Sequence, residues 1–127
     1  MIYLDTHAVV WLFLGRLELL PKWVLERIDR ADDLRISPMV ALELDLLHQI
    51  GRTRGPAREV IADLGARAGL RVCDLPFAAV AAAATHLDWT RDPFDRLIVA
   101  QAIAARATLL TRDRRIRRHA PVASWGD

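Results

Sequence analysis

Four carboxylates stand where the chain is otherwise apolar, and their positions suggest one shared chemistry. Asp5 closes the stretch IYL, Asp113 closes the stretch TLLTR, and Asp95 lies at the start of the apolar run LIVAQA. Glu43 falls inside the apolar stretch MVALELDLL. Carboxylates that converge raise one another's pKa unless a cation lies between them. Oxygen ligands suit Mg²⁺ or Mn²⁺, and these ions promote the hydrolysis of phosphate esters.

Glu43 is the sharpest of these anomalies. On a helical wheel of residues 38–52, Glu43 lies nearly opposite Asp45, on the apolar face between Val40 and Ile50. An unpaired carboxylate on such a face is costly, so it needs a cation or a proton. An ion pair with an arginine is the ordinary explanation, and a metal site is the interpretation that we favour.

The acids near helix starts have ordinary explanations as well. Asp5 could cap the helix that follows it, but Thr6 serves that purpose, and we expect Thr6 to be the cap. Asp92 precedes Pro93 and is well placed as an N-cap. Asp95 lies in the first turn of the same helix, where the helix dipole favours an anion. We expect Asp95 to be the metal ligand, with Asp92 as an alternative or a more distant ligand.

The basic residues are concentrated near Asp113. Between Arg91 and His119 the chain has eight arginines and three aspartates. The planar guanidinium suits phosphate, so this cluster predicts contact with a polyanion; a solvated final turn is the alternative. Asp113 itself could be a local ion-pair partner. The candidate phosphate-binding residues are Arg112, Arg114, Arg115, Arg117 and Arg118.

The elements that must position these residues alternate between strands and helices. Strands or extended segments are predicted at 1–5, 34–37, 71–75, 107–111 and 121–125. Helices are predicted at 6–14, 21–32, 37–51, 56–69, 76–87 and 92–107, with a basic turn or short helix at 113–119. This order predicts an α/β domain with a mainly parallel central sheet and helices on both faces. Sites in such sheets form at the carboxyl ends of the strands, where the strand order reverses.

Composition indicates an ordinary globular domain. With 127 residues, 53% hydrophobic and 27% charged, the chain is long enough for one core and too apolar for disorder. No apolar run approaches the length of a membrane span, and the apolar start lacks a basic leader. The single Cys73 cannot form an internal disulfide. We therefore expect a cytoplasmic protein and assign no function to this cysteine.

Four stretches taken together resemble the PIN-domain ribonucleases, specifically the VapC toxins of prokaryotic toxin–antitoxin pairs. They are LDTHAVVW (4–11), ISPMVALEL (36–44), RDPFDRLIVAQA (91–102) and LLTRD (109–113), with VASW near the end. They occur in family order and span almost the whole chain. The resemblance implies one PIN domain over residues 1–127 and a Mg²⁺- or Mn²⁺-dependent endoribonuclease, usually acting on structured RNA such as tRNA or rRNA.

The resemblance also implies residue roles and partners. Its four acids match Asp5, Glu43, Asp95 and Asp113 in order. The three aspartates would bind metal, while the glutamate would act through water or orient the nucleophile that attacks the phosphorus. Thr6 and Thr111 match small polar neighbours that orient the pocket. A VapC also implies a VapB-type antitoxin that blocks the site, and usually a toxin homodimer.

Two other functions are alternatives to this one. A phosphoacceptor receiver domain needs paired acids after the first strand and a late lysine, whereas Asp5 is followed by Thr6 and the only lysine is Lys22. A PIN-like module that binds RNA or a partner without cutting remains an alternative. The histidines have no place in the nuclease scheme, and we expect them to be solvated or satisfied; the ones considered are His7, His86 and His119.

Overall fold

The computed structural model describes residues 1–126, in which five strands form one parallel sheet in the order β3-β2-β1-β4-β5. The strands are β1 (Ile2–Leu4), β2 (Leu34–Ile36), β3 (Arg71–Val72), β4 (Thr108–Leu110) and β5 (Ala123–Ser124). All five extended segments predicted from the sequence are present, although each is shorter than predicted. The predicted α/β fold with a central parallel sheet is confirmed.

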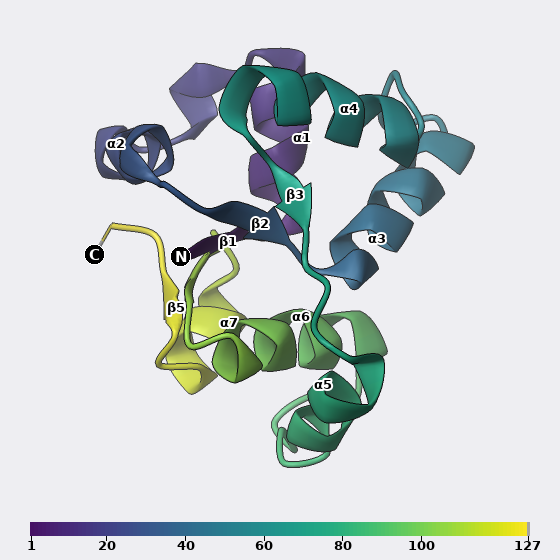
Figure 1. Cartoon of the computed structure of the whole chain (residues 1–127), viewed down its shortest axis with the longest axis vertical. Helices are drawn as coiled ribbons and strands as arrows, with labels where there is room; N and C mark the ends of the chain where they lie inside the picture. Colours follow the sequence, from purple (N-terminus) through teal and green to yellow (C-terminus); the bar gives the residue numbers. More distant parts are fainter. Residues whose placement is uncertain (127) are drawn as a thin grey trace.

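Helices cover both faces of the sheet. They are α1 (Thr6–Leu14), α2 (Lys22–Arg30), α3 (Pro38–Gln49), α4 (Ala57–Ala68), α5 (Phe77–Ala84), α6 (Pro93–Ala104) and α7 (Arg114–His119). A 3-10 turn, η1 (Leu17–Leu19), was not expected from the sequence. In Figure 1, α1, α2 and α4 lie on one side of the sheet, and α6 and α7 lie on the other. The basic segment at 113–119 forms a helix rather than a turn.

The predicted start of α3 is present with the expected cap. The Ser37 hydroxyl accepts a hydrogen bond from the Met39 amide at 3.1 Å, and Pro38 occupies the first helical position. The expectation that Thr6 caps α1 was wrong. Asp5 is the cap, because its Oδ1 accepts the Thr6 amide hydrogen bond at 2.8 Å. The hydroxyl of Thr6 is thereby left available for another partner.

The strand order reverses at β1. The chain passes from β1 to β2 on one side, and it reaches β4 on the other side only after α6. The register pairs Ile2 with Leu34 and Leu4 with Leu110. The carboxyl ends of β1 and β4 are therefore neighbours at the switch point, which is where open α/β sheets form their sites.

The core holds these strand ends in place. Leu4, Leu109 and Leu110 are almost fully buried, as are Ile98 and Val99 of α6. Close packing of these apolar side chains fixes the direction in which each strand leaves the sheet.

Within residues 1–126, no helix combines the length and apolar character needed to cross a membrane.

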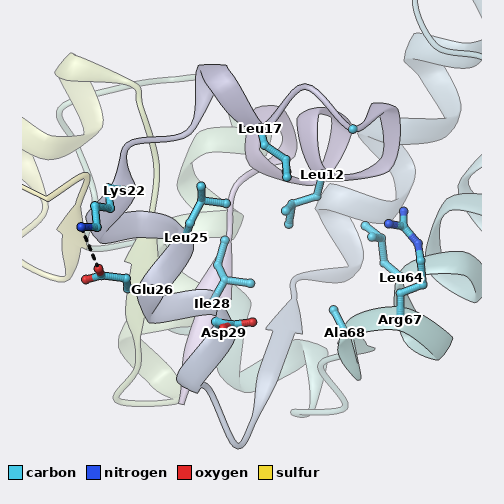
Figure 2. Close-up of a pocket in the computed structure, with 11 residues that line it drawn as sticks. Leu12, Leu17, Lys22, Leu25, Glu26, Ile28, Asp29, Leu64, Arg67 and Ala68 are labelled. Carbon is cyan, nitrogen blue, oxygen red and sulfur yellow. Dashed lines mark ion pairs between the residues drawn. The ribbon is translucent and has the colours of Figure 1, made fainter.

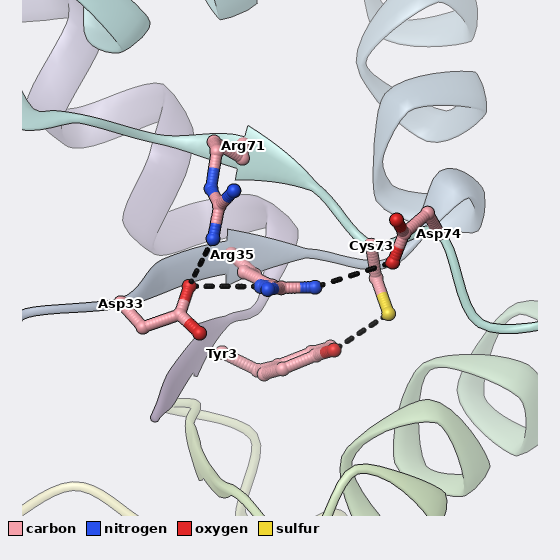
Figure 3. Close-up of polar contacts among 6 residues, drawn as sticks. All are labelled: Tyr3, Asp33, Arg35, Arg71, Cys73 and Asp74. Atoms are coloured by element: carbon pink, nitrogen blue, oxygen red, sulfur yellow. Dashed lines mark hydrogen bonds and ion pairs between the residues drawn. The ribbon is translucent and has the colours of Figure 1, made fainter.

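A polar network links β2 and the edge strand β3 to β1 (Figure 3). The Tyr3 hydroxyl donates to Cys73 Sγ, and burial followed by this contact raises the pKa of Tyr3 above its ordinary value. Arg35 pairs with Asp33 at 2.8 Å, and the same carboxylate accepts from Arg71 at 3.0 Å. Partly exposed pairs of this kind add little stability, so we interpret the network as fixing the position of the short strand β3.

Candidate active site

Asp5 lies at the carboxyl end of β1 and is almost fully buried, with 8% of its surface exposed. Its Oδ2 accepts a hydrogen bond from Thr111 Oγ1 at 2.5 Å. Thr111, which follows β4, is fully buried, and its Oγ1 also accepts the Asp113 amide hydrogen bond at 3.1 Å. One hydroxyl therefore ties the first acid of the chain to the segment that carries the last one.

Asp113 is exposed and caps α7. Its Oδ1 accepts a hydrogen bond from the Ile116 amide at 2.9 Å. In the part of the chain that the structure describes, Asp113 has no ion pair with an arginine, so the ion-pair alternative does not hold. The cap leaves its second carboxylate oxygen available to a ligand.

Glu43 points from α3 toward α1, where Thr6 Oγ1 donates a hydrogen bond to its Oε1. Burial raises the pKa of Glu43; the Thr6 hydrogen bond opposes this rise and the charge of Asp5 adds to it. Glu43 is half-buried rather than enclosed. Ile50, which the helical wheel places on the same apolar face, is 66% exposed. Among residues 1–126 no arginine pairs with Glu43, which argues against a structural ion pair.

Asp92 and Asp95 have different positions at the start of α6: Asp92 is the N-cap, and Asp95 lies in the first turn. Asp92 is the predicted N-cap of α6, and its Oδ1 accepts from the Phe94 amide at 2.8 Å. Asp95 is half-buried, and its pKa is raised to about 6 by burial first and then by the charges of neighbouring acids. These neighbours are Asp92, Asp113, Asp5 and Glu43. The fold thus brings all the acids singled out in the sequence into one electrostatic cluster.

The donor set of this cluster fits a hard divalent cation. The available ligands are carboxylate and hydroxyl oxygens, which Mg²⁺ and Mn²⁺ prefer. Within residues 1–126, however, no group of three His, Cys, Asp or Glu side chains is arranged to hold one ion. Like charges at this distance raise one another's pKa, and a bound cation would relieve that repulsion.

The basic cluster around α7 divides into two groups. Three arginines have specific contacts. Arg112 lies 5.5 Å from the Trp11 ring centroid, Arg115 Nη2 donates to the Trp89 carbonyl at 2.6 Å, and Arg117 Nη2 donates to the Arg112 carbonyl at 3.2 Å. Two others, Arg114 and Arg118, are exposed on α7.

A small pocket of about 220 Å³ adjoins the acids and is lined by His7, Arg112 and Asp113. Behind it, the ring of Trp11 lies 5.8 Å from that of His7 and 6.2 Å from that of Trp125. The sequence reasoning gave His7 no role and did not single out the two tryptophans. The available signal was the spacing of His7 and Trp11, one helical turn apart directly after Asp5.

A larger cavity of about 480 Å³ lies away from the acids (Figure 2). It is formed by α1, η1, α2 and α4, with leucine side chains as its floor and charged residues at its rim. The apolar lining includes Leu12, Leu25 and Leu64. At one end Lys22 pairs with Glu26 at 4.0 Å. Size alone does not identify this cavity as the reactive site, because its described lining contains none of the clustered acids.

Comparison with solved structures gives the same fold. VapBC2 from Rickettsia felis, bound to a DNA fragment from its promoter, matches with a TM-score of 0.63 and 23% identity, over 97% of this chain and 96% of that chain. VapBC-1 from nontypeable Haemophilus influenzae matches with a TM-score of 0.65 and 22% identity, over 100% and 98% of the two chains. FitAB bound to the IR36 DNA fragment matches with a TM-score of 0.58 and 25% identity, over 97% and 92%.

Comparison of the sequence itself places the chain in a family. No curated protein matches it. The family model described as PIN domain matches residues 2–121, which is nearly the whole chain. The match includes every acid of the cluster, and the parallel sheet and its switch point agree with it. The chain therefore belongs to the PIN domain family.

Proposed function

We propose that this protein is a Mg²⁺- or Mn²⁺-dependent endoribonuclease that acts as the VapC-type toxin of a toxin–antitoxin pair. The observation that carries the proposal is the joining of Asp5 and Asp113 through Thr111 at the ends of β1 and β4, beside Asp95, whose pKa is raised to about 6 by burial and by four other acids. This much uncompensated negative charge at a strand switch point is typical of a cation-binding site. Family membership and the VapBC and FitAB structures support the nuclease and toxin assignments.

Each acid has a separate task in this proposal. Asp5, Asp95 and Asp113 would hold the divalent cation, with Asp92 close enough to add charge. A bound cation of this kind activates water and neutralises charge on the phosphate being cut. Glu43 would orient the attacking water, and its carboxylate, whose pKa is raised by burial, would accept a proton from that water as the new P–O bond forms. Thr6 and Thr111 hold the carboxylates of Glu43 and Asp5 by hydrogen bonds.

A cleavage assay on a broad pool of cellular RNA, including tRNA and rRNA, tests the proposal. We expect cutting with Mg²⁺ or Mn²⁺, no cutting in EDTA, and no cutting by Asp5→Asn under any condition. Asn caps a helix about as well as Asp, so this variant should fold. The exposed Asp88→Asn is a matched control that should cut like the wild type.

A binding module without cleavage is the alternative function. The observation in its favour is that residues 1–126 contain no ready-made group of three metal-ligating side chains. Binding of RNA without metal-dependent cutting by the wild type, across the whole RNA pool, would establish this alternative.

We also propose a VapB-type antitoxin as the protein partner, in the cytoplasm. The groove between α1, α2 and α4 offers such a partner an apolar floor and a rim of both charges, which suits an amphipathic helix. Copurification with the product of the adjacent reading frame tests this. Leu25→Glu should abolish copurification, while Ile103→Glu, on an exposed isoleucine outside the groove, should not.

A toxin homodimer is proposed on a separate surface. Leu42 and Leu46 of α3 and Ile50, its C-cap, are spaced four residues apart and are 50%, 39% and 66% exposed. An exposed apolar stripe of this kind is typical of a helix that packs against another protein. Sedimentation should show a dimer for the wild type and a monomer for Leu46→Glu.

A further inference from the structure

The pocket between His7 and Arg112 has features that the metal-dependent reaction does not require. Its walls come from the same two segments as the acids, because His7 follows Asp5 by two residues and Arg112 directly precedes Asp113. We propose that this pocket receives one unpaired nucleobase of the RNA, stacked on the imidazole and guanidinium faces beside the phosphate that is cut. The inference rests on the proposed nuclease function and adds a determinant of which RNA segment is cut.

Flat side chains supply the stacking surfaces. Arg112 lies 5.5 Å from the centroid of the Trp11 ring, and His7 lies 5.8 Å from it at an interplanar angle of 48°. Trp11 therefore contacts two of the residues that line the pocket, and the Trp125 ring centroid lies 6.2 Å from that of Trp11. Proteins hold unstacked bases on aromatic side chains and on guanidinium planes of this kind.

Charge and size favour a base over a phosphate. Asp113 forms the third wall, and its carboxylate beside Arg112 makes the pocket less attractive to a phosphate than a pocket lined by arginine alone. The volume of about 220 Å³ is smaller than a typical ligand pocket, roughly 300–1,000 Å³, and suits one flat ring system. A base can enter only when it is unpaired, so the pocket selects single-stranded loops and ends.

Ring contact distinguishes Arg112 from two arginines of α7. The Arg112 guanidinium lies 5.5 Å from the Trp11 ring centroid, and the Arg112 carbonyl accepts a hydrogen bond from Arg117 Nη2 at 3.2 Å. Arg114 and Arg118 are exposed like Arg112. We assign the stacking surface to Arg112 because it lines the pocket, and salt-sensitive contacts to phosphate to Arg114 and Arg118.

An equilibrium binding experiment separates base contacts from phosphate contacts. Fluorescence anisotropy is measured for Asp5→Asn protein with a single-stranded octanucleotide RNA and with an abasic backbone of the same length. We expect Asp5→Asn to bind the RNA at least about fivefold more tightly than the abasic backbone, since one stacked base contributes that much or more. Adding either His7→Ala or Arg112→Ala to Asp5→Asn should remove most of this preference. The affinity for the abasic backbone should be unchanged by His7→Ala.

The controls are His86→Ala and Arg30→Ala, which remove an exposed histidine and an exposed arginine elsewhere and should keep the preference. Trp11→Phe retains an aromatic support and should reduce the preference only partly, whereas Trp11→Leu should abolish it. Circular dichroism confirms the fold of each variant.

Three results would overturn the inference. An equal loss of affinity for both ligands in His7→Ala would assign the histidine to phosphate. An unchanged preference in both pocket variants, while the wild type still cuts RNA with metal, would remove the base subsite and leave the proposed function standing. Failure of the wild type to bind or cut any RNA would remove both.

Discussion

Thr111 Oγ1 donates a hydrogen bond of 2.5 Å to Asp5 Oδ2, across 106 positions of the chain. The same hydroxyl oxygen accepts the Asp113 amide hydrogen bond at 3.1 Å. Because Thr111 is fully buried, water cannot replace either contact. A single side chain therefore fixes the relative positions of the two strand ends that carry acids.

Replacing Thr111 by Val keeps its shape and removes the hydroxyl. Asp5 and the Asp113 amide each lose a partner, so the free energy of unfolding should fall by about 1–3 kcal/mol. RNA cleavage should fall further than stability explains, because Asp5 is no longer held in one orientation. Thr111→Ser should restore both. Urea unfolding and cleavage at saturating Mn²⁺ measure the two effects, and full activity in Thr111→Val would contradict the positioning role.

Glu43→Gln removes a charge and keeps an acceptor for the Thr6 hydroxyl. Since burial and Asp5 raise the pKa of Glu43, the neutral side chain should leave the melting temperature unchanged or higher. Cleavage should be lost, because glutamine cannot exchange a proton with water. A large drop in melting temperature, measured by circular dichroism, would instead indicate that the charge of Glu43 supports the fold.

The stability of the metal-free protein should depend on the protonation of Asp95. Its pKa of about 6 in the folded protein exceeds the ordinary value of 3.8, so the folded state binds this proton more tightly than the unfolded state. The contribution is therefore fully present below about pH 4 and is lost as the pH rises through about 6. Urea unfolding in EDTA across this range should show the loss in wild type and a flatter profile in Asp95→Asn. If Asp95→Asn shows the same dependence of stability on pH as the wild type, the group that titrates is not Asp95.

Divalent cations should raise the melting temperature at pH 7.5, where the acids repel one another most. A cation that binds only the folded state stabilises it in proportion to the logarithm of its concentration. Scanning fluorimetry with Mn²⁺ should show a rise in wild type and in Asp88→Asn, and a much smaller rise in Asp5→Asn and Asp95→Asn. Equal rises in all four proteins would indicate that the cation binds outside the acidic cluster.

The exposed arginines of α7 should govern the salt dependence of RNA binding. Each phosphate contact contributes about 0.7 to the logarithmic slope for single strands, so the double variant Arg114→Gln/Arg118→Gln should lower the slope by about 1.4. Arg30→Gln/Arg58→Gln, at exposed positions on α2 and α4, is the control pair. Anisotropy titrations at several salt concentrations give the slopes, and equal slopes in the two double variants would move the RNA path away from α7.

The alternation of elements and the order of the acids could be predicted from the sequence because they depend on local pattern. Apolar runs ending in Asp5 or preceding Asp113 predict strand ends, and Ser37 followed by Pro38 predicts a helix start. The parallel sheet then follows from the strand–helix alternation. The family resemblance added the roles of the acids, since spacing alone does not distinguish a ligand from a cap.

Contacts between distant segments could not be predicted in the same way. Thr6 was expected to cap α1, but Asp5 takes that position and the Thr6 hydroxyl bonds to Glu43. The apolar face of α3 was expected to be buried, but Ile50 is largely exposed because no other element of the described chain covers it. The pocket beside His7 depends on Trp11 and Arg112 meeting in space, which no local pattern reports.

The place of β4 beside β1 has a consequence for synthesis on the ribosome. β1 is made first, yet its neighbour on one side is β4, which cannot pair until nearly the whole chain has emerged. A nascent chain stalled before Thr108 has neither Thr111 to hold Asp5 nor Asp113 to complete the acidic cluster. A chain that ends before Thr108 should therefore lack the cation binding and the nuclease activity that we propose for the acidic cluster.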